Sequence, residues 1–174
     1  MTDITRHAIV DTPVGAVTIV AGPAGIQGLY YAEHRPAPDA SRFGARDDAV
    51  VGVLAEATTQ LREYLAGERT AFDLPLDPVG TEFQLRVWQA LRTIPYGETR
   101  TYGWIAAQLG QPTAVRAVGL ANSRNPISIV VPCHRVVGAA GQLTGYAGGL
   151  ACKRTLLDLE SGALLDDGAL HSVA

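Results

Sequence analysis

The 174-residue chain contains two cysteines, Cys133 and Cys152, and a single lysine, Lys153. Two cysteines are too few for a disulfide framework or a four-thiolate zinc site, so we expect free thiols and a reducing compartment. The sequence also lacks any run of the roughly 20 apolar residues that a membrane-spanning helix needs. Its N-terminus is charged and polar, with no apolar stretch of signal-peptide length. These absences predict a cytoplasmic protein.

Neither sign of charge prevails strongly, because 14 Lys and Arg stand against 17 Asp and Glu, for a formal net charge of −3. Taken for the whole chain, this value disfavours a nucleic-acid partner, since domains that bind phosphate are usually basic. The charge is unevenly divided, however. Residues 1–80 hold six basic and eleven acidic residues, whereas residues 81–160 hold eight basic and four acidic ones. The net value therefore conceals a basic second half.

The first half, 1–76, has the pattern of a small α/β unit. Three short β-rich runs are predicted as strands: Ala8–Asp11, Val14–Ala21 and Ile26–Tyr31. The turn residues between the first two favour a hairpin. Arg35–Arg46 is predicted as a loop, and from Asp47 onward apolar residues, beginning with Val50, recur at helical spacing. A last short strand is expected over Phe72–Leu76, before a linker at 77–80.

The second half, 81–162, is predicted to be mostly helical. Four helices are expected: from an N-cap at Thr81 to about Ile94, from Thr101 to Leu109, from after Thr113 to about Arg124, and over Ala151–Glu160. The second and third are short and joined at Gly110, which is the shape of a helix-turn-helix. Asn125-Pro126 ends the third, because the residue before a proline is disfavoured in a helix. A flexible acidic tail is expected over 163–174.

The sharpest local motif is Pro132-Cys133-His134-Arg135. A cysteine beside a His and an Arg has a positive environment, which favours the nucleophilic thiolate over the thiol. Free cysteines are also among the residues most often buried as small apolar side chains. The tetrapeptide alone leaves both interpretations open.

Further motifs occur around it in a fixed order: Phe83-Gln84-Leu85-Arg86-Val87-Trp88, Ile94-Pro95-Tyr96-Gly97-Glu98-Thr99, Arg116-Ala117-Val118-Gly119, Asn125-Pro126, residues 129–138, Gly145-Tyr146-Ala147-Gly148-Gly149 and residues 153–160. In this order and spacing they resemble the O6-alkylguanine-DNA alkyltransferase family. The resemblance is strong over about half of the chain and extends more weakly through the first half. It implies a ribonuclease-H-like α/β domain, with a small antiparallel sheet plus a helix, followed by a mostly α-helical domain with a helix-turn-helix.

The function that the resemblance implies is single-turnover DNA repair. Such a protein flips an O6-alkylguanine out of double-stranded DNA, bound through the minor groove, and moves the alkyl group to its own cysteine. O4-alkylthymine is a second substrate that the sequence does not rank. No cofactor is implied, and because the first half has no cysteine, we expect no zinc site there. We expect a monomer with no membrane partner.

The resemblance assigns the catalytic roles by position. Cys133 matches the alkyl acceptor, His134 the base that takes its proton through a water, and Glu160 the carboxylate that orients this His. Asn125 matches a hinge residue that ties the preceding helix to the active-site loop. Without the resemblance, His134 could also be a surface His, and we would interpret Glu160 as an ordinary helix-end charge and Asn125 as a helix stop.

Three positions are assigned to the substrate base. Tyr146 matches a hydroxyl donor to the departing guanine, whose anion would be a poor leaving group in a dry pocket. Ala147 stands where the family often has Ser, so one hydroxyl is lost. Its backbone N–H can still reach O6, and we therefore expect activity to survive. The Val136 carbonyl matches an acceptor for the exocyclic amine of guanine.

Six residues are assigned to DNA binding: Tyr102, Arg116, Ala117, Gly119, Ala121 and Arg124. Tyr102 would crowd the target phosphate, and Arg116 would enter the base stack and fill the vacated space. The small residues of this set suit a helix in the narrow minor groove, although they suit packing between helices equally well.

Two rival functions use the same residues. A non-catalytic sensor of alkylated DNA would bind without transfer, but sensors of this fold lack the acceptor cysteine, and Cys133 is present. A thiol hydrolase using Cys133 and His134 would turn over repeatedly. Cys152 matches an apolar position on the last helix and is expected to serve packing.

Overall fold

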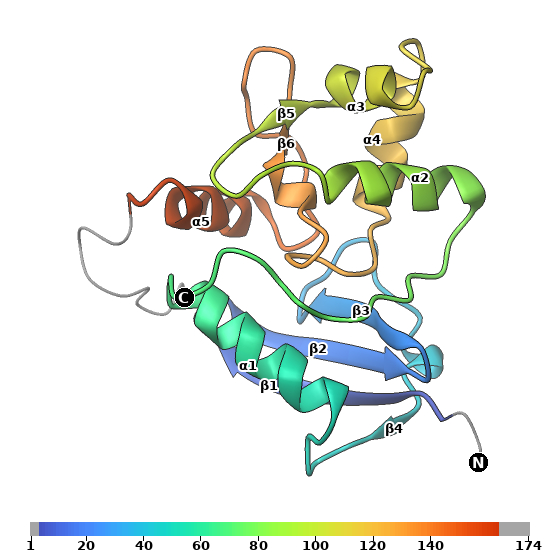
Figure 1. Ribbon diagram of the computed structural model, residues 1–174, viewed down its shortest axis with the longest axis vertical. Helices are drawn as coiled ribbons and strands as arrows, with labels where there is room; N and C mark the ends of the chain where they lie inside the picture. The colour runs from blue at the N-terminus through green and yellow to red at the C-terminus, as the bar shows by residue number, and fades with distance from the viewer. Residues whose placement is uncertain (1–3, 164–174) are drawn as a thin grey trace.

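The computed structural model describes residues 4–163, so the tail expected over 163–174 lies outside the described residues except for Ala163. Figure 1 shows a small sheet with one helix on its face at one end of the molecule and the remaining helices at the other. Within the described residues, no helix is long and apolar enough to cross a membrane.

The sheet has the strand order β3-β2-β1-β4. Its strands are β1 (Arg6–Thr12), β2 (Gly15–Gly22), β3 (Gly25–Tyr31) and β4 (Ala45–Arg46). The first three were predicted and form antiparallel hairpins, with ends shifted by one or two residues. The prediction of a loop throughout Arg35–Arg46 was wrong at β4, which pairs with β1 in parallel. Two exposed residues without an apolar pattern carry no local strand signal.

Helix α1 (Val53–Leu65) covers one face of the sheet and begins later than the sequence predicted. Val50 and Gly52 have φ angles of 49° and 59°, which no right-handed helix contains, so Val50 precedes the helix. The strand predicted over Phe72–Leu76 is also wrong, apart from a single bridge between Leu76 and Ile26. Pro75 has no N–H to extend a ladder there.

The second half contains α2 (Glu82–Leu91), α3 (Tyr102–Gln108), α4 (Val115–Ser123) and α5 (Leu150–Glu160). The predicted N-cap at Thr81 is confirmed, and Thr101, predicted as the start of the next helix, proves to be its N-cap. The Thr81 hydroxyl accepts a hydrogen bond from the Gln84 N–H at 3.2 Å, and the Gln84 side chain accepts one in return from the Thr81 N–H at 3.0 Å. The Thr101 hydroxyl accepts from the N–H of Trp104 at 3.1 Å and starts α3.

The two halves meet at the free edge of β3. The N–H of Leu29 donates to the Pro126 carbonyl at 2.8 Å, and the N–H of Ser128 donates to the Leu29 carbonyl at 3.3 Å. The short strands β5 (Arg100–Thr101) and β6 (Val136–Val137) pair in parallel within the second half. The segment that leads from α4 to Cys133 is therefore held directly by the first-half sheet.

Candidate active site

A cavity of about 550 Å³ lies where α3, α4 and the segment before α5 converge. The predicted site residues that line it are Tyr102, Arg116, Gly119, Asn125, Cys133, Tyr146 and Ala147. Arg35 and Pro36 of the first half also line the cavity, and neither was predicted from the sequence. These two residues reach the cavity only because the two halves of the chain are in contact. A local sequence pattern cannot predict such a contact.

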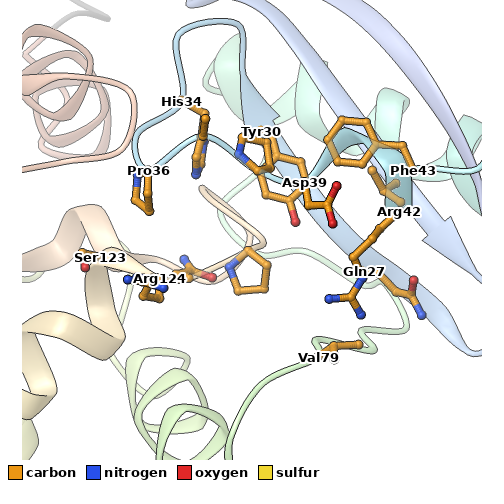
Figure 2. Close-up of a pocket in the computed structure, with 15 residues that line it drawn as sticks. Gln27, Tyr30, His34, Pro36, Asp39, Arg42, Phe43, Val79, Ser123 and Arg124 are labelled. Atoms are coloured by element: carbon orange, nitrogen blue, oxygen red, sulfur yellow. The ribbon is translucent and has the colours of Figure 1, made fainter.

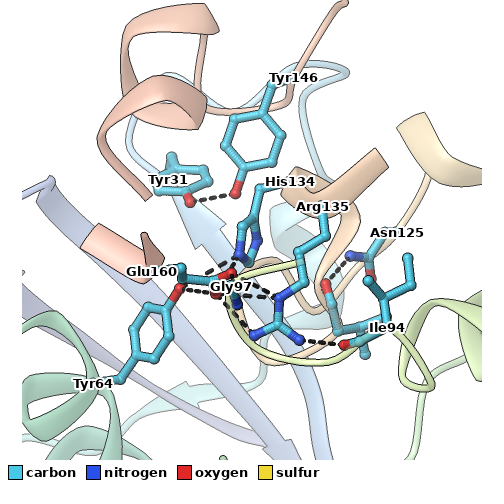
Figure 3. A network of polar contacts seen from close by, with 10 residues as sticks. Tyr31, Tyr64, Ile94, Gly97, Asn125, His134, Arg135, Tyr146 and Glu160 are labelled. Atoms are coloured by element: carbon cyan, nitrogen blue, oxygen red, sulfur yellow. Dashed lines mark hydrogen bonds and ion pairs between the residues drawn. The ribbon is translucent and has the colours of Figure 1, made fainter. Parts of the chain in front are cut away.

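The side chains of the short 3-10 turn η2 (Cys133–Arg135) have two different surroundings. Cys133 faces the cavity, whereas His134 and Arg135 bind Glu160 (Figure 3). The expectation that Arg135 gives the thiol a positive environment is therefore corrected. Burial raises the pKa of the Cys133 thiol, and the Asn125 amide and the Lys153 ammonium only partly oppose this. The resting thiol is protonated and needs a base.

His134 has the properties of that base. Its Nε2 lies 2.8 Å from Oε1 of Glu160, and both side chains are fully buried. A carboxylate oxygen can only accept, so Nε2 carries the proton and Nδ1 is the free acceptor. Burial lowers the pKa of His134, which keeps the imidazole neutral at pH 7. Among the described residues, none makes a hydrogen bond to this buried Nδ1.

Glu160, the last residue of α5, accepts hydrogen bonds from several side chains. Arg135 donates from Nε to Oε2 at 2.9 Å and from Nη2 to Oε1 at 2.8 Å, and the hydroxyl of Tyr64 donates to Oε1 at 2.6 Å (Figure 3). Burial alone would raise the pKa of Glu160, but the hydrogen bonds from His134 and Arg135 lower it to about 2. Tyr64 comes from α1 and was missed because it occupies an apolar helical position typical of core residues.

Asn125 joins the end of α4 to the segment before Cys133. Its Nδ2 donates to the Val131 carbonyl at 2.8 Å, and its Oδ1 accepts from the Ile127 N–H at 3.0 Å. The side chain is 2% exposed. The turn that it closes contains Ile129 at a φ of 71°, an unfavourable conformation for a β-branched residue. The Asn125 bonds hold this strained turn in place.

The three positions assigned to the base differ in their surroundings. Tyr146 and Ala147 line the cavity, and the hydroxyl of Tyr146 lies 2.6 Å from the hydroxyl of Tyr31 in β3. Val136 is fully buried and is not among the residues that line the cavity. Its carbonyl accepts from Nζ of Lys153 at 2.6 Å, and this lysine has no exposed surface.

The DNA-binding candidates on α4 differ in how far they are exposed. Arg116 and Ala117 are exposed and Gly119 is half-buried, whereas Ala121 is 2% exposed. The Ala121 carbonyl accepts from Nε1 of Trp88 at 2.8 Å, so the small residue at this position allows α2 and α4 to pack closely. Of the two readings offered for Ala121, its burial favours packing.

Two further DNA-binding candidates lie beside α4. The half-buried Tyr102 bonds through its hydroxyl to Oγ1 of Thr144 at 2.5 Å. Arg124 is exposed at the end of α4 and borders a second cavity of about 340 Å³, which Figure 2 shows between α4 and the loop after β3. Among the described residues, no group of three or more His, Cys, Asp or Glu is placed to hold a metal ion.

Comparison with known proteins places this geometry in a family. Residues 82–162 match the family model described as 6-O-methylguanine DNA methyltransferase, DNA binding domain. Residues 5–78 match the model of the ribonuclease-like domain of the same protein. The chain belongs to the 6-O-methylguanine DNA methyltransferase family.

Individual relatives of this methyltransferase are similar along most of their length. A methylated-DNA–protein-cysteine methyltransferase of Mycobacterium leprae is 55% identical over 155 residues, which are 89% of this chain and 92% of the relative. One from Methanosarcina acetivorans is 48% identical over 88% of this chain and 97% of its own. The crystal structure of Mycobacterium tuberculosis OGT in complex with DNA superposes with a TM-score of 0.81 at 49% identity, covering 90% of this chain and 93% of that one. The methyltransferase thus combines an N-terminal small-sheet domain with a helical C-terminal DNA-binding domain.

Proposed function

We propose that this methyltransferase repairs DNA by moving the alkyl group of O6-alkylguanine to Cys133, once per molecule. The observation that carries the proposal is the Cys133 thiol at a cavity of about 550 Å³, next in the chain to a neutral His134 that Glu160 holds. The relatives named methylated-DNA–protein-cysteine methyltransferase support the same reaction.

The proton of the Cys133 thiol passes through a bridging water to Nδ1 of His134. Glu160 then stabilises the imidazolium, as the carboxylate does in a hydrolase triad. The thiolate attacks the alkyl carbon from the side opposite O6, so a C–S bond forms as the C–O6 bond breaks. The electron pair of the broken bond goes to guanine, which takes up one proton from solvent, while His134 returns the thiol proton to solvent. Because the product is a thioether, each molecule acts once.

Three groups bind the flipped guanine in this proposal. The hydroxyl of Tyr146 donates to the departing guanine, and the N–H of Ala147 donates to O6. The Val136 carbonyl is buried and already accepts from Lys153, so guanine has to reach beyond the present cavity wall for its exocyclic amine to donate to the second lone pair. Asn125 keeps the loop before Cys133 in register with α4.

We place the DNA on α3 and α4, which we interpret as a helix-turn-helix that enters the minor groove. Arg116, exposed at the cavity, fills the space left by the flipped base, and Tyr102 faces the target phosphate. Ala117, Gly119 and Arg124 complete this surface. Residues 1–76 form the ribonuclease-H-like support domain, 77–80 the linker and 81–162 the active-site domain, and the protein acts as a monomer.

Titration of duplex DNA that holds one O6-methylguanine tests this function. We expect one guanine to be restored per protein molecule and no more. Cys133→Ser should abolish restoration and keep DNA binding, whereas the matched control Cys152→Ser should keep both. Tight binding without restoration would identify a lesion sensor, and more than one restoration per molecule would identify a turning-over enzyme.

A further inference from the structure

The side of the cavity that receives the leaving group touches the N-terminal domain. Tyr31, the last residue of β3, is 7% exposed, and its hydroxyl lies 2.6 Å from the hydroxyl of Tyr146. The two rings meet edge to face, with centroids 5.7 Å apart. Figure 3 shows the two hydroxyls directed at one another above His134. Tyr31 is not among the three groups that receive guanine.

Two further contacts fix the segment around Tyr146 against the N-terminal domain. The N–H of Arg35 donates to the Ala147 carbonyl at 3.0 Å. Gly148 lies on the ring of Tyr31 so closely that a Cβ there would come within 2.7 Å of Cε2. The backbone on either side of the Tyr146–Tyr31 contact is therefore held, and the geometry of the hydroxyl pair is set by packing.

We propose that Tyr31 is a positioning residue for alkyl transfer, whose hydroxyl donates to the Tyr146 oxygen and so directs the Tyr146 hydrogen at the departing guanine. This inference rests on the proposed role of Tyr146. Each phenol has one hydrogen to donate. If Tyr31 donates to Tyr146, the hydrogen of Tyr146 is free for the base, and the pair forms a chain in which each bond strengthens the next.

The surroundings of the pair suit this role. Burial raises the pKa of both phenols well above their usual value of 10, so both keep their hydrogens at neutral pH. As the C–O6 bond breaks, the negative charge on guanine strengthens its hydrogen bond from Tyr146. This increases the negative charge on the Tyr146 oxygen, which the hydrogen bond from Tyr31 stabilises. The proton that leaves the thiol for His134 is balanced by the proton that guanine takes up, so neither phenol is consumed.

The test compares Tyr31→Phe with Tyr30→Phe as a matched control. Tyr30 is the preceding residue of β3, but its ring stacks on Phe43 and borders the second cavity instead. Single-turnover transfer rates are measured at saturating protein on duplex DNA that contains O6-benzylguanine or its 8-bromo derivative. Bromine withdraws electrons and makes the purine a better leaving group, which therefore depends less on a hydrogen-bond donor.

We expect Tyr31→Phe to slow transfer from O6-benzylguanine by about fivefold, the effect of a typical hydrogen bond, with DNA affinity unchanged. With the 8-bromo substrate, Tyr31→Phe should slow transfer by less than about twofold, because this better leaving group depends less on a hydrogen-bond donor. Tyr30→Phe should match the wild-type rate on both. Tyr146→Phe should cost more, and Tyr31→Phe added to it should cost nothing further, because the two act as one unit.

Equal losses on both substrates would overturn the inference in favour of a purely structural role. A wild-type rate in Tyr31→Phe would overturn it too, because Tyr146 would then donate to Tyr31 instead. Additive losses in the double variant would do the same. A wild-type protein that restores no guanine would instead refute the proposed function, so the two failures are distinguishable.

Discussion

In the proposed reaction, the Cys133 nucleophile has to be generated from the thiol, since burial stabilises the thiol form. The residue next to it supplies the means, because His134 is buried, neutral and tied through Nε2 to a carboxylate. Arg135, which follows in the chain, serves that carboxylate and not the thiol. Sequence neighbours in a tight turn thus have separate functions.

The pH dependence of transfer follows from these two groups. The pKa of His134 is lowered from 6.5, so the base stays neutral as pH falls from 8 through 6.5, and the transfer rate should stay level there and drop only at lower pH. In His134→Gln the thiol must ionise unaided. Because its pKa is raised from 9.0, the remaining rate should climb with pH beyond 9. Single-turnover rates from pH 5 to 10 check both profiles, and a midpoint above 6.5 in the wild type would contradict the assignment of the base.

Glu160→Gln should lower the free energy of unfolding by about 3 kcal/mol, because it leaves Arg135 and His134 buried beside a neutral amide. The pKa of Glu160 is lowered from 4.5 to about 2, so its contribution is complete above pH 4.5 and is lost as pH falls toward 2. The stability gap between wild type and variant should narrow across this range. Urea unfolding at pH 7 and pH 3 measures it.

The control for that variant is Glu98→Gln. Glu98 pairs with Arg100 at 2.6 Å on the surface, and such pairs contribute less than about 1 kcal/mol. If Glu98→Gln lowered the free energy of unfolding as much as Glu160→Gln, the large effect at Glu160 could not be attributed to burial of its ion pairs.

At the scale of elements, α4 has a buried face and an exposed face, to which we assign different tasks. Val118 and Ala121 are buried, with Ala121 bonded to Trp88 of α2, while Arg116 and Ala117 remain exposed. The sequence predicted the helix and its end correctly, but small residues alone could not tell a packing face from a binding face. The packing face can be identified only from the position of α2, which belongs to the tertiary structure.

Arg116→Ala should separate base flipping from chemistry. Filling the vacated space matters only when the lesion is paired in a duplex, so transfer from duplex O6-methylguanine should fall by at least about tenfold, while reaction with free O6-benzylguanine should change little. Arg154→Ala, an exposed position on α5, is the matched control and should affect neither reaction. Equal losses of Arg116→Ala on the two substrates would argue against a flipping role.

At the scale of the whole molecule, the N-terminal domain takes part in the site directly. The edge of β3 holds the segment before Cys133 through Leu29, Tyr64 of α1 reaches Glu160, and Tyr31 reaches Tyr146. An acidic domain behind a basic, DNA-binding one explains how a chain of net charge −3 binds a polyanion.

Local patterns predicted most of the elements of this molecule but not the contacts between its halves. Thr81 was identifiable as a cap and Thr101 as the start of a helix, because both signals depend on residues within one turn. Tyr31 and Tyr64 looked like ordinary strand and core residues, since their partners lie 115 and 96 positions away. The family resemblance assigned roles to Cys133, His134 and Glu160 but to neither of these two tyrosines.

Peptide mapping after reaction with duplex O6-methylguanine tests the central claim most directly. Trypsin cleaves after Arg124, Arg135 and Lys153, which places Cys133 and Cys152 on separate peptides. The account predicts one methyl group on the peptide 125–135 in every reacted molecule, and none on 136–153. An unmodified peptide 125–135 from a protein that has restored guanine in the DNA would contradict it.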